Sequence, residues 1–479
     1  MSAQEVKSTP LGVPEVVEAF WRIEAQENLV DWKVLGINIW PLIRSKLFYH
    51  LTNNSGIYAW RNYKPLELPD WVERHNGTPG HLALWQGLTG WRWYLRALIP
   101  NKFKDPRLAQ WRKATTAVAP FSNRDSLGED RYSKAVLQQL GDQALLFGVG
   151  SWDRTKATPH LDNLGQLFRD RWGFWASILV RLRVSRADYE KYARVIGYLE
   201  KTLNTTAGKY RPFPRWILRN FMCERRGYRK IFRRLNIQRI FIVNASRMFF
   251  MGAAQSCGIK VIELQCGVFS KYNMQFSWPG RPAVSYLPDE IWTWGDYWTE
   301  GIENSGAQRI VVAGATEEFE KARETPAKHL PKTIVAMSQP LNGADFYRKM
   351  IDLAKLLPEY QIIFKPHPKD DLAAFEGQMP SNMKMANPQE RSIDLIRDSE
   401  VCVGVFSTAL IEAASLGTKV AILKLAGWEH LEPFINGKYA NAYETVDELA
   451  KDLPDLLPSP NPYHFYGKRV PVAELLASN

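Results

Sequence analysis

The segment 401–423 restricts the fold more than any other part of the chain, because it has the pattern of two parallel strands joined by a crossover helix. An apolar run of strand length leads into the hydroxyl pair Ser407-Thr408, an apolar helix is expected to follow, and Gly417 is placed to end that helix before the next apolar run. Hydroxyls and free backbone N–H groups at a helix start suit a phosphate, and Glu412 lies one turn further on the same face, where a carboxylate can reach a ribose diol. An ordinary capped crossover helix has the same pattern, so this segment alone does not establish a nucleotide site.

Two other predicted strands end in polar residues that belong to the same edge of the sheet. The apolar run 361–364 leads into Lys365-Pro366-His367-Pro368, where the prolines fix the backbone around His367. The run 333–337 leads into Ser338-Gln339. Because ligands of open parallel sheets bind at the carboxyl ends of the strands, we expect the three strand ends to share one pocket. The predicted nucleotide-binding residues are Ser338, Gln339, Lys365, His367, Ser407, Thr408 and Glu412.

These motifs carry a resemblance to a known family. Ser-Gln-Pro at 338–340, Lys-Pro-His-Pro at 365–368 and Phe-Ser-Thr-Ala-Leu-Ile-Glu-Ala at 406–413 resemble the nucleotide-binding half of the GT-B glycosyltransferases that build bacterial capsule and O-antigen polysaccharide. That group includes the polysialyltransferases, the capsule Kdo-transferases and the teichoic-acid polymerases. The resemblance implies an α/β fold of the GT-B type, with two doubly wound Rossmann-like domains that face a central cleft.

The resemblance continues upstream of these motifs. Residues 261–268 are similar to the family's Glu-Leu-Gln-His-Gly-Val segment, and Cys266 stands where the family has a His. The resemblance continues through 288–298 and, more weakly, back to 36–44, so it spans most of the chain. It implies that Gln265, Cys266 and Gly267 lie on the acceptor side of the cleft.

The domain organisation follows from length and from the alternation of strands and helices in both halves. A chain of 479 residues fits two large domains. We expect an N-terminal acceptor-side domain with helical and aromatic elaborations at 1–313, a hinge at 314–331 and a nucleotide-sugar-binding domain at 332–455. The tail at 456–479 is expected to return to the N-terminal domain, as it does in many GT-B enzymes.

Transfer of a sugar from a nucleotide requires a stabilised leaving phosphate and an activated acceptor hydroxyl. The chain has no convincing D-x-D motif, so we expect no metal and no cofactor, with Lys365, His367 and the helix start at Ser407 neutralising the leaving group. Candidates for the general base are Asp125 and Glu129, in a polar loop that also holds Asp130 and follows a predicted strand at 116–121. The competing interpretation is that this loop is acidic only because it is solvated. Glu263 is a rival carboxylate. Cys266 cannot replace an imidazole near neutral pH, because the pKa of a thiol is about two units higher. The predicted catalytic residues are Asp125, Glu129 and His367.

The charge of the chain points to an anionic neighbour. The formal net charge is +12, and basic residues crowd the amphipathic stretch 211–234. A second stretch, 85–103, mixes Trp and Tyr with Arg and Lys, as a bilayer interface or an aromatic core helix does. Peripheral contact with the anionic inner membrane competes with an ordinary solvated helix face for 211–234. The polar N-terminus and the lack of a membrane-spanning apolar run predict a cytoplasmic protein.

The function that best joins these observations is a metal-independent glycosyltransferase. It is expected to move a sugar from a nucleotide-activated donor to a growing, lipid-linked bacterial surface polysaccharide. Three alternatives stay open: a nucleotide-sugar 2-epimerase, a non-catalytic GT-B subunit for which Cys266 is the hint, and a nucleic-acid-binding protein. No nucleic-acid-binding motif accompanies the positive charge, so nucleic acid is not the expected partner. The donor base, whether CMP, CDP, UDP or another, is left open by these motifs.

Overall fold

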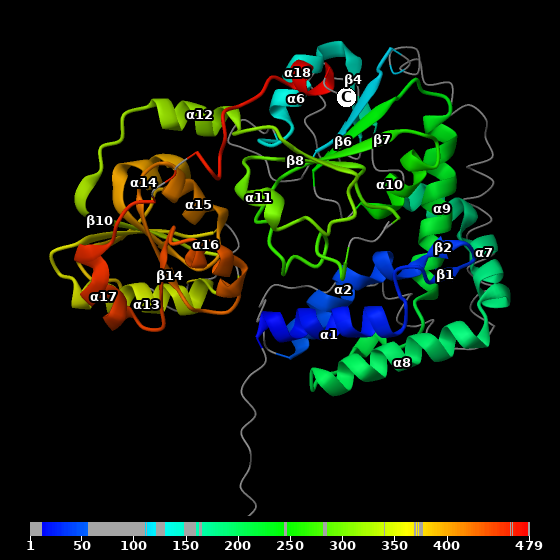
Figure 1. The fold of residues 1–479 in the computed structure, drawn as a ribbon, viewed down its shortest axis with the longest axis horizontal. Helices are drawn as coiled ribbons and strands as arrows, with labels where there is room; N and C mark the ends of the chain where they lie inside the picture. Colours follow the sequence, from blue (N-terminus) through cyan, green and yellow to red (C-terminus); the bar gives the residue numbers. More distant parts are fainter. Residues whose placement is uncertain are drawn as a thin grey trace, which may run out of the picture.

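Two parallel β-sheets, each covered by helices on both faces, form the two halves of the computed structural model (Figure 1). The structure describes residues 12–55, 111, 113–120, 130–147, 160–161, 165–243, 247–280, 285–339, 341–367, 370, 372, 377–459, 461 and 463–477. The α/β fold class predicted from the sequence, with two doubly wound domains of the GT-B type, is confirmed.

The sheet of the first domain has seven strands among the described residues, in the order β5-β4-β3-β6-β7-β8-β9, and all neighbouring pairs are parallel. Successive side chains of a strand point to opposite faces, and both faces are buried. One face packs on α6 and α18, and the other packs on α9, α10 and α2. The strands are β3 (Thr116–Ala119), β4 (Ala144–Phe147), β5 (His160–Leu161), β6 (Arg239–Val243), β7 (Lys260–Leu264), β8 (Glu290–Thr293) and β9 (Arg309–Val312), and the helices are α2 (Ile39–Asn54), α6 (Lys134–Leu140), α9 (Arg215–Phe232), α10 (Met248–Gln255), α11 (Tyr297–Glu300) and α18 (Val472–Ala477).

The sheet of the second domain has six described strands in the order β12-β11-β10-β13-β14-β15, again all parallel. Helices α13 and α17 cover one face, and α14 and α15 cover the other (Figure 1). The strands are β10 (Leu330–Met337), β11 (Gln361–Lys365), β12 (Met383–Met385), β13 (Ser399–Gly404), β14 (Lys419–Leu423) and β15 (Asn441–Tyr443), and the helices are α13 (Gly343–Leu356), α14 (Ser392–Asp398), α15 (Thr408–Ser415), α16 (Glu432–Asn436) and α17 (Val446–Asp452). The predicted unit at 401–423 is therefore β13, α15 and β14.

A helical layer extends the first domain below its sheet in Figure 1. It contains α1 (Val13–Gln26), α2 and α8 (Arg186–Thr202), while α7 (Gly165–Arg183) packs along α9. A short hairpin of β1 (Lys33–Val34) and β2 (Ile37–Asn38) precedes α2. Leu35 and Gly36 adopt positive φ and reverse the chain in this hairpin, and α2 begins directly after it at Ile39.

A buried ion pair holds α1 and α2 together. Arg44 donates from Nη2 to Glu24 Oε2 at 3.0 Å and from Nε to Glu24 Oε1, and both side chains are fully buried. Trp40 Nε1 donates to the same carboxylate at 2.8 Å, while Arg44 also donates to the carbonyl of Met274 and stacks over Trp278 at 4.0 Å. The pair thus ties the helical layer to the segment 267–280, which follows β7.

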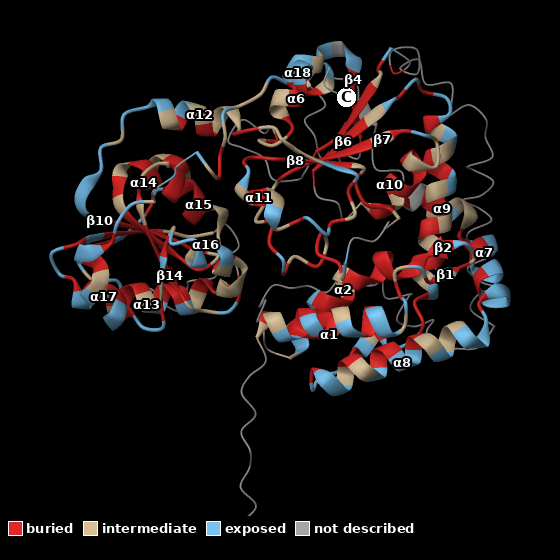
Figure 2. Ribbon diagram, in the orientation of Figure 1, coloured by how far each residue is buried: buried red, intermediate tan, exposed pale blue. Residues whose placement is uncertain are grey.

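Two chain segments join the domains. The first carries α12 (Glu317–Glu324), and the second is the tail, which crosses back so that α18 packs on α6 of the first domain (Figure 1). The two segments are hydrogen-bonded side by side, with Ala315 N donating to Gly467 O and Val470 N to Ala313 O, both at 3.0 Å. Figure 2 shows that buried residues fill the centre of each half. Among the described residues, no helix is long and apolar enough to cross a membrane.

Candidate active site

The three strand ends singled out in the sequence are neighbours in the second sheet. Strand β10 lies between β11 and β13, and the registers pair Met337 with Lys365 and Ala336 with Val403. Because all three strands are parallel, their carboxyl ends form one continuous edge. Ser338 follows β10 directly, while His367 and Ser407 come two and three residues after the ends of β11 and β13, so the structure brings these predicted residues to the same edge.

The helix start at this edge has the geometry expected for an anion site. Ser407 is the N-cap of α15, with φ −76° and ψ 147°, and its Oγ accepts a hydrogen bond from Ala409 N at 3.3 Å. Thr408 is the first helical residue, and both hydroxyl-bearing residues are half-buried. The remaining first-turn N–H groups and the helix dipole supply positive potential at this point.

Ser338 and Gln339 occupy the centre of the edge with different contacts. Ser338 is buried, and its Oγ has no hydrogen-bond partner among the described residues. Gln339 uses its side-chain oxygen to accept from Phe406 N at 2.9 Å, which joins the end of β10 to the turn before α15. The Ser338 hydroxyl therefore has hydrogen-bonding capacity that the described residues do not use, and Gln339 holds the turn that precedes Ser407.

Lys365 and His367 stand at the end of β11. The Lys365 ammonium donates to the carbonyl oxygens of Asn387 at 3.0 Å and Glu390 at 2.7 Å, and its burial lowers the pKa of this lysine. The His367 backbone N–H donates to the carboxylate of Asp370 at 2.8 Å, and Asp370 N returns a hydrogen bond to His367 O at 2.9 Å. This reciprocal pair fixes the backbone of the half-buried His367 at the end of β11.

The loop after β14 packs against Phe406, in the turn between β13 and α15. The sequence motifs did not reveal this contact. Gly427 has a φ of +91°, and a Cβ there would lie 2.6 Å from the Phe406 ring. Phe406 also faces the ring of His430, with centroids 5.5 Å apart. The close approach requires a glycine, so the position of Phe406 next to Ser407 depends on Gly427.

Glu412 reaches across to the first domain. It is buried on α15, and its Oε1 accepts from Arg131 Nη2 at 3.2 Å. Burial raises the pKa of Glu412, and the Arg131 guanidinium opposes this rise. A ribose contact by Glu412 would therefore compete with Arg131 for the same carboxylate.

The segment after β7 makes a second set of contacts between the domains. Ser270 Oγ lies 3.1 Å from His430 Nδ1, Tyr272 OH donates to Glu432 Oε2 at 2.6 Å, and Lys271 pairs with Glu432 at 3.1 Å. These contacts place the loop that begins at Cys266 and Gly267 against the second domain. His430 and Glu432 escaped the sequence motifs because their partners, Ser270 and Tyr272, are 160 residues away along the chain.

His430 gives the interface a pH dependence. Burial lowers the pKa of its imidazole to about 4, whereas the unfolded side chain titrates near 6.5. Between these values the unfolded chain binds a proton that the folded protein does not, so stability falls as the pH falls. Between pH 7 and pH 5 the wild type is expected to lose on the order of 2 kcal/mol more of its unfolding free energy than His430→Asn does. The asparagine does not titrate and can still hydrogen-bond Ser270.

Urea unfolding at the two pH values measures this difference, and His329→Asn at an exposed site is the control. An equal loss of stability in the wild type and in His430→Asn would show that His430 is protonated in the folded protein at pH 5.

The predicted acceptor-side residues lie at the end of β7. Gln265 is buried, donates from Nε2 to Gly267 O at 3.0 Å and accepts from Trp294 N at 2.9 Å. Cys266 is half-buried beside it. Gln265 therefore fixes the loop that carries Cys266 and Gly267, and its amide is engaged with the backbone.

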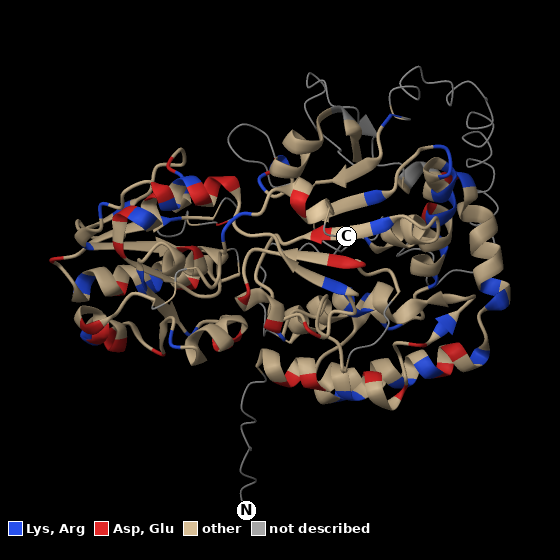
Figure 3. Ribbon diagram, turned by 45° about the horizontal axis from the view of Figure 1, so that its top comes forward, with Lys and Arg blue, Asp and Glu red and all other residues tan. Residues whose placement is uncertain are grey.

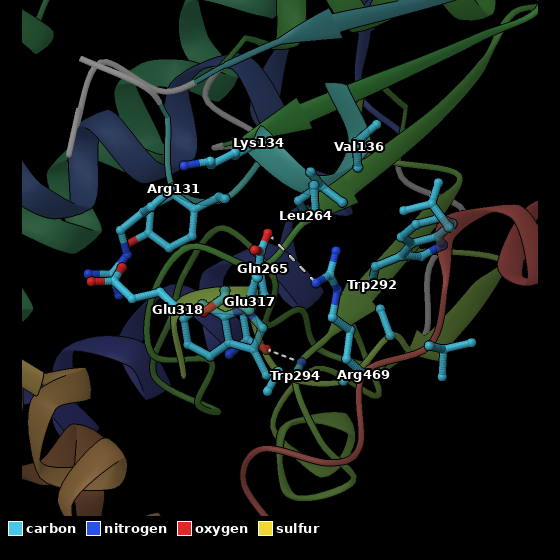
Figure 4. A pocket seen from close by; sticks show the side chains of 18 of the residues that line it. Arg131, Lys134, Val136, Leu264, Gln265, Trp292, Trp294, Glu317, Glu318 and Arg469 are labelled. Carbon is cyan, nitrogen blue, oxygen red and sulfur yellow. Dashed lines mark hydrogen bonds and ion pairs between the residues drawn. The ribbon is translucent and has the colours of Figure 1, made fainter. Parts of the chain in front are cut away.

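A cavity of about 250 Å³ opens beside these residues, between α6, α12 and the tail (Figure 4). A column of stacked rings runs along it, with Tyr132 on Trp294 at 6.2 Å, Trp294 on Tyr466 at 5.3 Å and Tyr466 on Phe319 at 4.1 Å. Glu317 pairs with Lys321 at 2.7 Å and with Arg469 at 3.8 Å. Basic side chains outnumber acidic ones in the lining: Arg131, Lys134, Lys321, Arg391 and Arg469 against Glu317 and Glu318.

The predicted base candidates Asp125 and Glu129 lie outside the described residues. The neighbouring Asp130 is buried and accepts from the Ser133 hydroxyl and backbone N–H, which starts α6. Glu263 is buried on β7. Among the described residues, no group of three or more His, Cys, Asp or Glu side chains could hold a metal ion.

The solved structures to which the chain is similar include a glycosyltransferase, a 2-epimerase and a polymerase, each at a TM-score below 0.5. The chain is similar to the glycosyltransferase of kitacinnamycin (TM-score 0.40, 13% identity, 73% of this chain and 92% of that one). It is similar to the UDP-GlcNAc 2-epimerase from Neisseria meningitidis bound to UDP-GlcNAc (0.44, 13%, 76% and 100%). It is also similar to the wall teichoic acid polymerase TagF (0.40, 11%, 81% and 96%). No protein-family model and no curated protein sequence matches the chain.

Proposed function

We propose that this protein is a glycosyltransferase that takes a sugar from a nucleotide-activated donor. The observation that carries the proposal is the single edge formed by β11, β10 and β13, where Ser338, His367 and the hydroxyl-capped start of α15 lie together. The buried Ser338 Oγ, which has no partner among the described residues, supports a ligand at the centre of this edge. The fold alone does not select this chemistry, so the argument rests on the edge.

The donor phosphates would bind at the N-terminus of α15. Its free N–H groups, the hydroxyls of Ser407 and Thr408 and the imidazole of His367 would stabilise the charge that develops on the leaving phosphate. Lys365 contributes a positive charge close by while it holds the 387–390 backbone. Side chains and backbone N–H groups of the protein would thus neutralise the negative charge of the leaving phosphate, a role that a metal ion bound to a D-x-D motif can also fill.

The acceptor would approach from the first domain. Asp125 and Glu129 are proposed as general bases because they come shortly before Arg131 in the sequence, and Arg131 contacts α15 through Glu412. Cys266 and Gly267 lie in the loop whose continuation, Ser270 to Tyr272, contacts the second domain. The lipid-linked surface polysaccharide remains the proposed acceptor class, and the basic, aromatic cavity is suited to an acidic sugar unit of it.

A thermal-shift screen with CMP, CDP, UDP, GDP and TDP tests donor binding. A nucleotide at about 100 times its dissociation constant is expected to stabilise the protein by about 2.7 kcal/mol, because it binds only the folded state. A single-stranded oligonucleotide of matched charge is the control. Stabilisation by the oligonucleotide and by no mononucleotide would favour the nucleic-acid alternative instead.

Turnover with the nucleotide sugar that binds then separates the remaining candidates. Transfer to a lipid-linked glycan is the expected outcome. Epimerised nucleotide sugar without transfer would identify a 2-epimerase, and binding without either product would identify a non-catalytic subunit.

A further inference from the structure

The second half of helix α7 exposes large apolar side chains to solvent. Five of them lie on the outside of the helix, where Figure 2 shows α7 at the right edge with exposed outer residues. Their exposed fractions are 48% for Phe174, 66% for Trp175, 36% for Ile178, 40% for Leu179 and 75% for Leu182. At 3.6 residues per turn they fall within an arc of about 140°, so they form one continuous stripe.

The inner face of this half of the helix is made of smaller residues, whereas Phe168 of the first half is buried against Tyr228 of α9. Gly173, Ala176, Val180 and Val184 are buried, and α7 packs along α9. A helix that serves only the core of its own domain buries its largest apolar side chains. From Gly173 onward the large residues of α7 are outside and the small ones inside, so the stripe is available for contact with something outside the described part of the chain.

Basic residues surround the stripe. Arg181 and Arg183 are exposed on its two sides. At the start of the helix, Arg171, Arg226 and Lys230 gather around the ring of Trp172, with their charged groups 5.4, 5.4 and 5.0 Å from its centroid. Figure 3 shows the Lys and Arg residues that accompany the α7 and α9 side of the molecule.

We infer that α7 docks the protein on an anionic lipid bilayer, with the helix lying in the interface and the stripe of Phe174, Trp175, Ile178, Leu179 and Leu182 inserted among the lipids. Apolar residues including a Trp, flanked by arginines, match the two layers of such a surface, acyl chains within and phosphates above. A second copy of the chain fits less well, because a two-fold contact through this stripe would bring the arginine rims of both copies together. Binding of α7 to a bilayer does not depend on sugar transfer. It would, however, place the proposed active site near a lipid-linked acceptor.

Under this inference the membrane contact predicted for the stretch 211–234 moves to α7. Helix α9 lies between α7 and α10, and Arg225 and Arg229 are half-buried, each with a buried Nε. Only some of its basic residues, such as Arg226, Lys230 and Arg233, are exposed. In this arrangement α9 contributes charge to the rim, and α7 makes the apolar contact.

Co-sedimentation with vesicles tests the inference on the full chain without donor or acceptor. The wild type is expected to bind vesicles of phosphatidylcholine with about 30% phosphatidylglycerol and to bind pure phosphatidylcholine more weakly. Trp175→Ser/Leu182→Ser should lower binding to both by at least about tenfold, because two inserted side chains are lost. Arg181→Gln/Arg183→Gln should mainly remove the preference for anionic vesicles and its sensitivity to salt.

Leu457→Ser is the matched control, since Leu457 is a highly exposed leucine of the second domain. All the substituted side chains are exposed, and circular dichroism checks that each variant is folded. The inference is overturned if the wild type binds neither kind of vesicle, or if Trp175→Ser/Leu182→Ser binds vesicles as well as the wild type does. It is also overturned if sedimentation velocity shows a dimer that Trp175→Ser/Leu182→Ser dissociates while vesicle binding is unchanged. None of these results bears on nucleotide binding, so they leave the proposed transferase activity to its own test.

Discussion

The variant Ser407→Ala/Thr408→Ala is expected to bind the nucleotide donor at least tenfold more weakly than the wild type, and His367→Ala is expected to lose a similar amount. Hydrogen bonds to a charged group contribute about 1.5 to 3 kcal/mol each, which corresponds to a factor of about 10 to 150 in the dissociation constant. The three residues lie at neighbouring strand ends, so each is placed to contact one phosphate group or its neighbour. Isothermal titration with the nucleotide found in the thermal-shift screen measures the effect.

Loss of a helix cap also destabilises the fold, so this prediction needs a control of the same kind. Ser185 is the N-cap of α8 and accepts a hydrogen bond from Asp188 N, far from the strand ends. We expect Ser185→Ala to lose about 1 kcal/mol of stability and no nucleotide affinity. Unchanged affinity in a folded Ser407→Ala/Thr408→Ala protein would remove the start of α15 from the site.

Glu24→Gln is expected to destabilise the protein by about 3 to 5 kcal/mol, the largest effect on stability that the structure suggests. The substitution leaves the fully buried Arg44 guanidinium without its charge partner. Because Arg44 also holds Met274 O, the segment 267–280 and its contacts with His430 and Glu432 should loosen as well. Urea unfolding measures the first effect, and nucleotide-sugar turnover reports the second.

A surface ion pair provides the comparison for Glu24. Glu190 pairs with Arg186 at 2.7 Å on α8, and their side chains are 56% and 92% exposed. We expect Glu190→Gln to cost no more than about 0.5 kcal/mol. The double replacement Glu24→Leu/Arg44→Met should recover part of the stability, since no charge is then left unpaired. A small effect of Glu24→Gln would mean that water reaches Arg44 in solution.

The strand ends of the second domain were predictable from the sequence because each signal is local. An apolar strand followed at once by Ser338-Gln339, by Lys365-Pro366-His367 or by Ser407-Thr408 places polar groups at the carboxyl end of a parallel strand, whatever the rest of the chain does. The order of the strands then brings the three ends together. Local signals do not extend to side chains that work across the interface.

The pairs Arg131–Glu412 and Arg44–Glu24 illustrate what the sequence could not supply. Glu412 could be placed on the inner face of α15, but its partner lies 281 residues away in the other domain. Arg44 and Glu24 lie on two different helices, so no periodicity links them. The stripe on α7 was missed for another reason, because apolar spacing alone does not distinguish the face toward the core from the face toward solvent when both are apolar.

The paired crossings at Ala315–Gly467 and Ala313–Val470 determine how the two domains can move. A single linker would let one domain swivel and twist freely about the other, whereas two linkers bonded side by side resist twisting and permit bending about one axis. The domains are therefore expected to open and close along a fixed path, which returns the start of α15 to the same position opposite Arg131 in each cycle. A protein truncated at residue 456 would keep only the linker that carries α12, and its two domains would then twist as well as bend relative to each other.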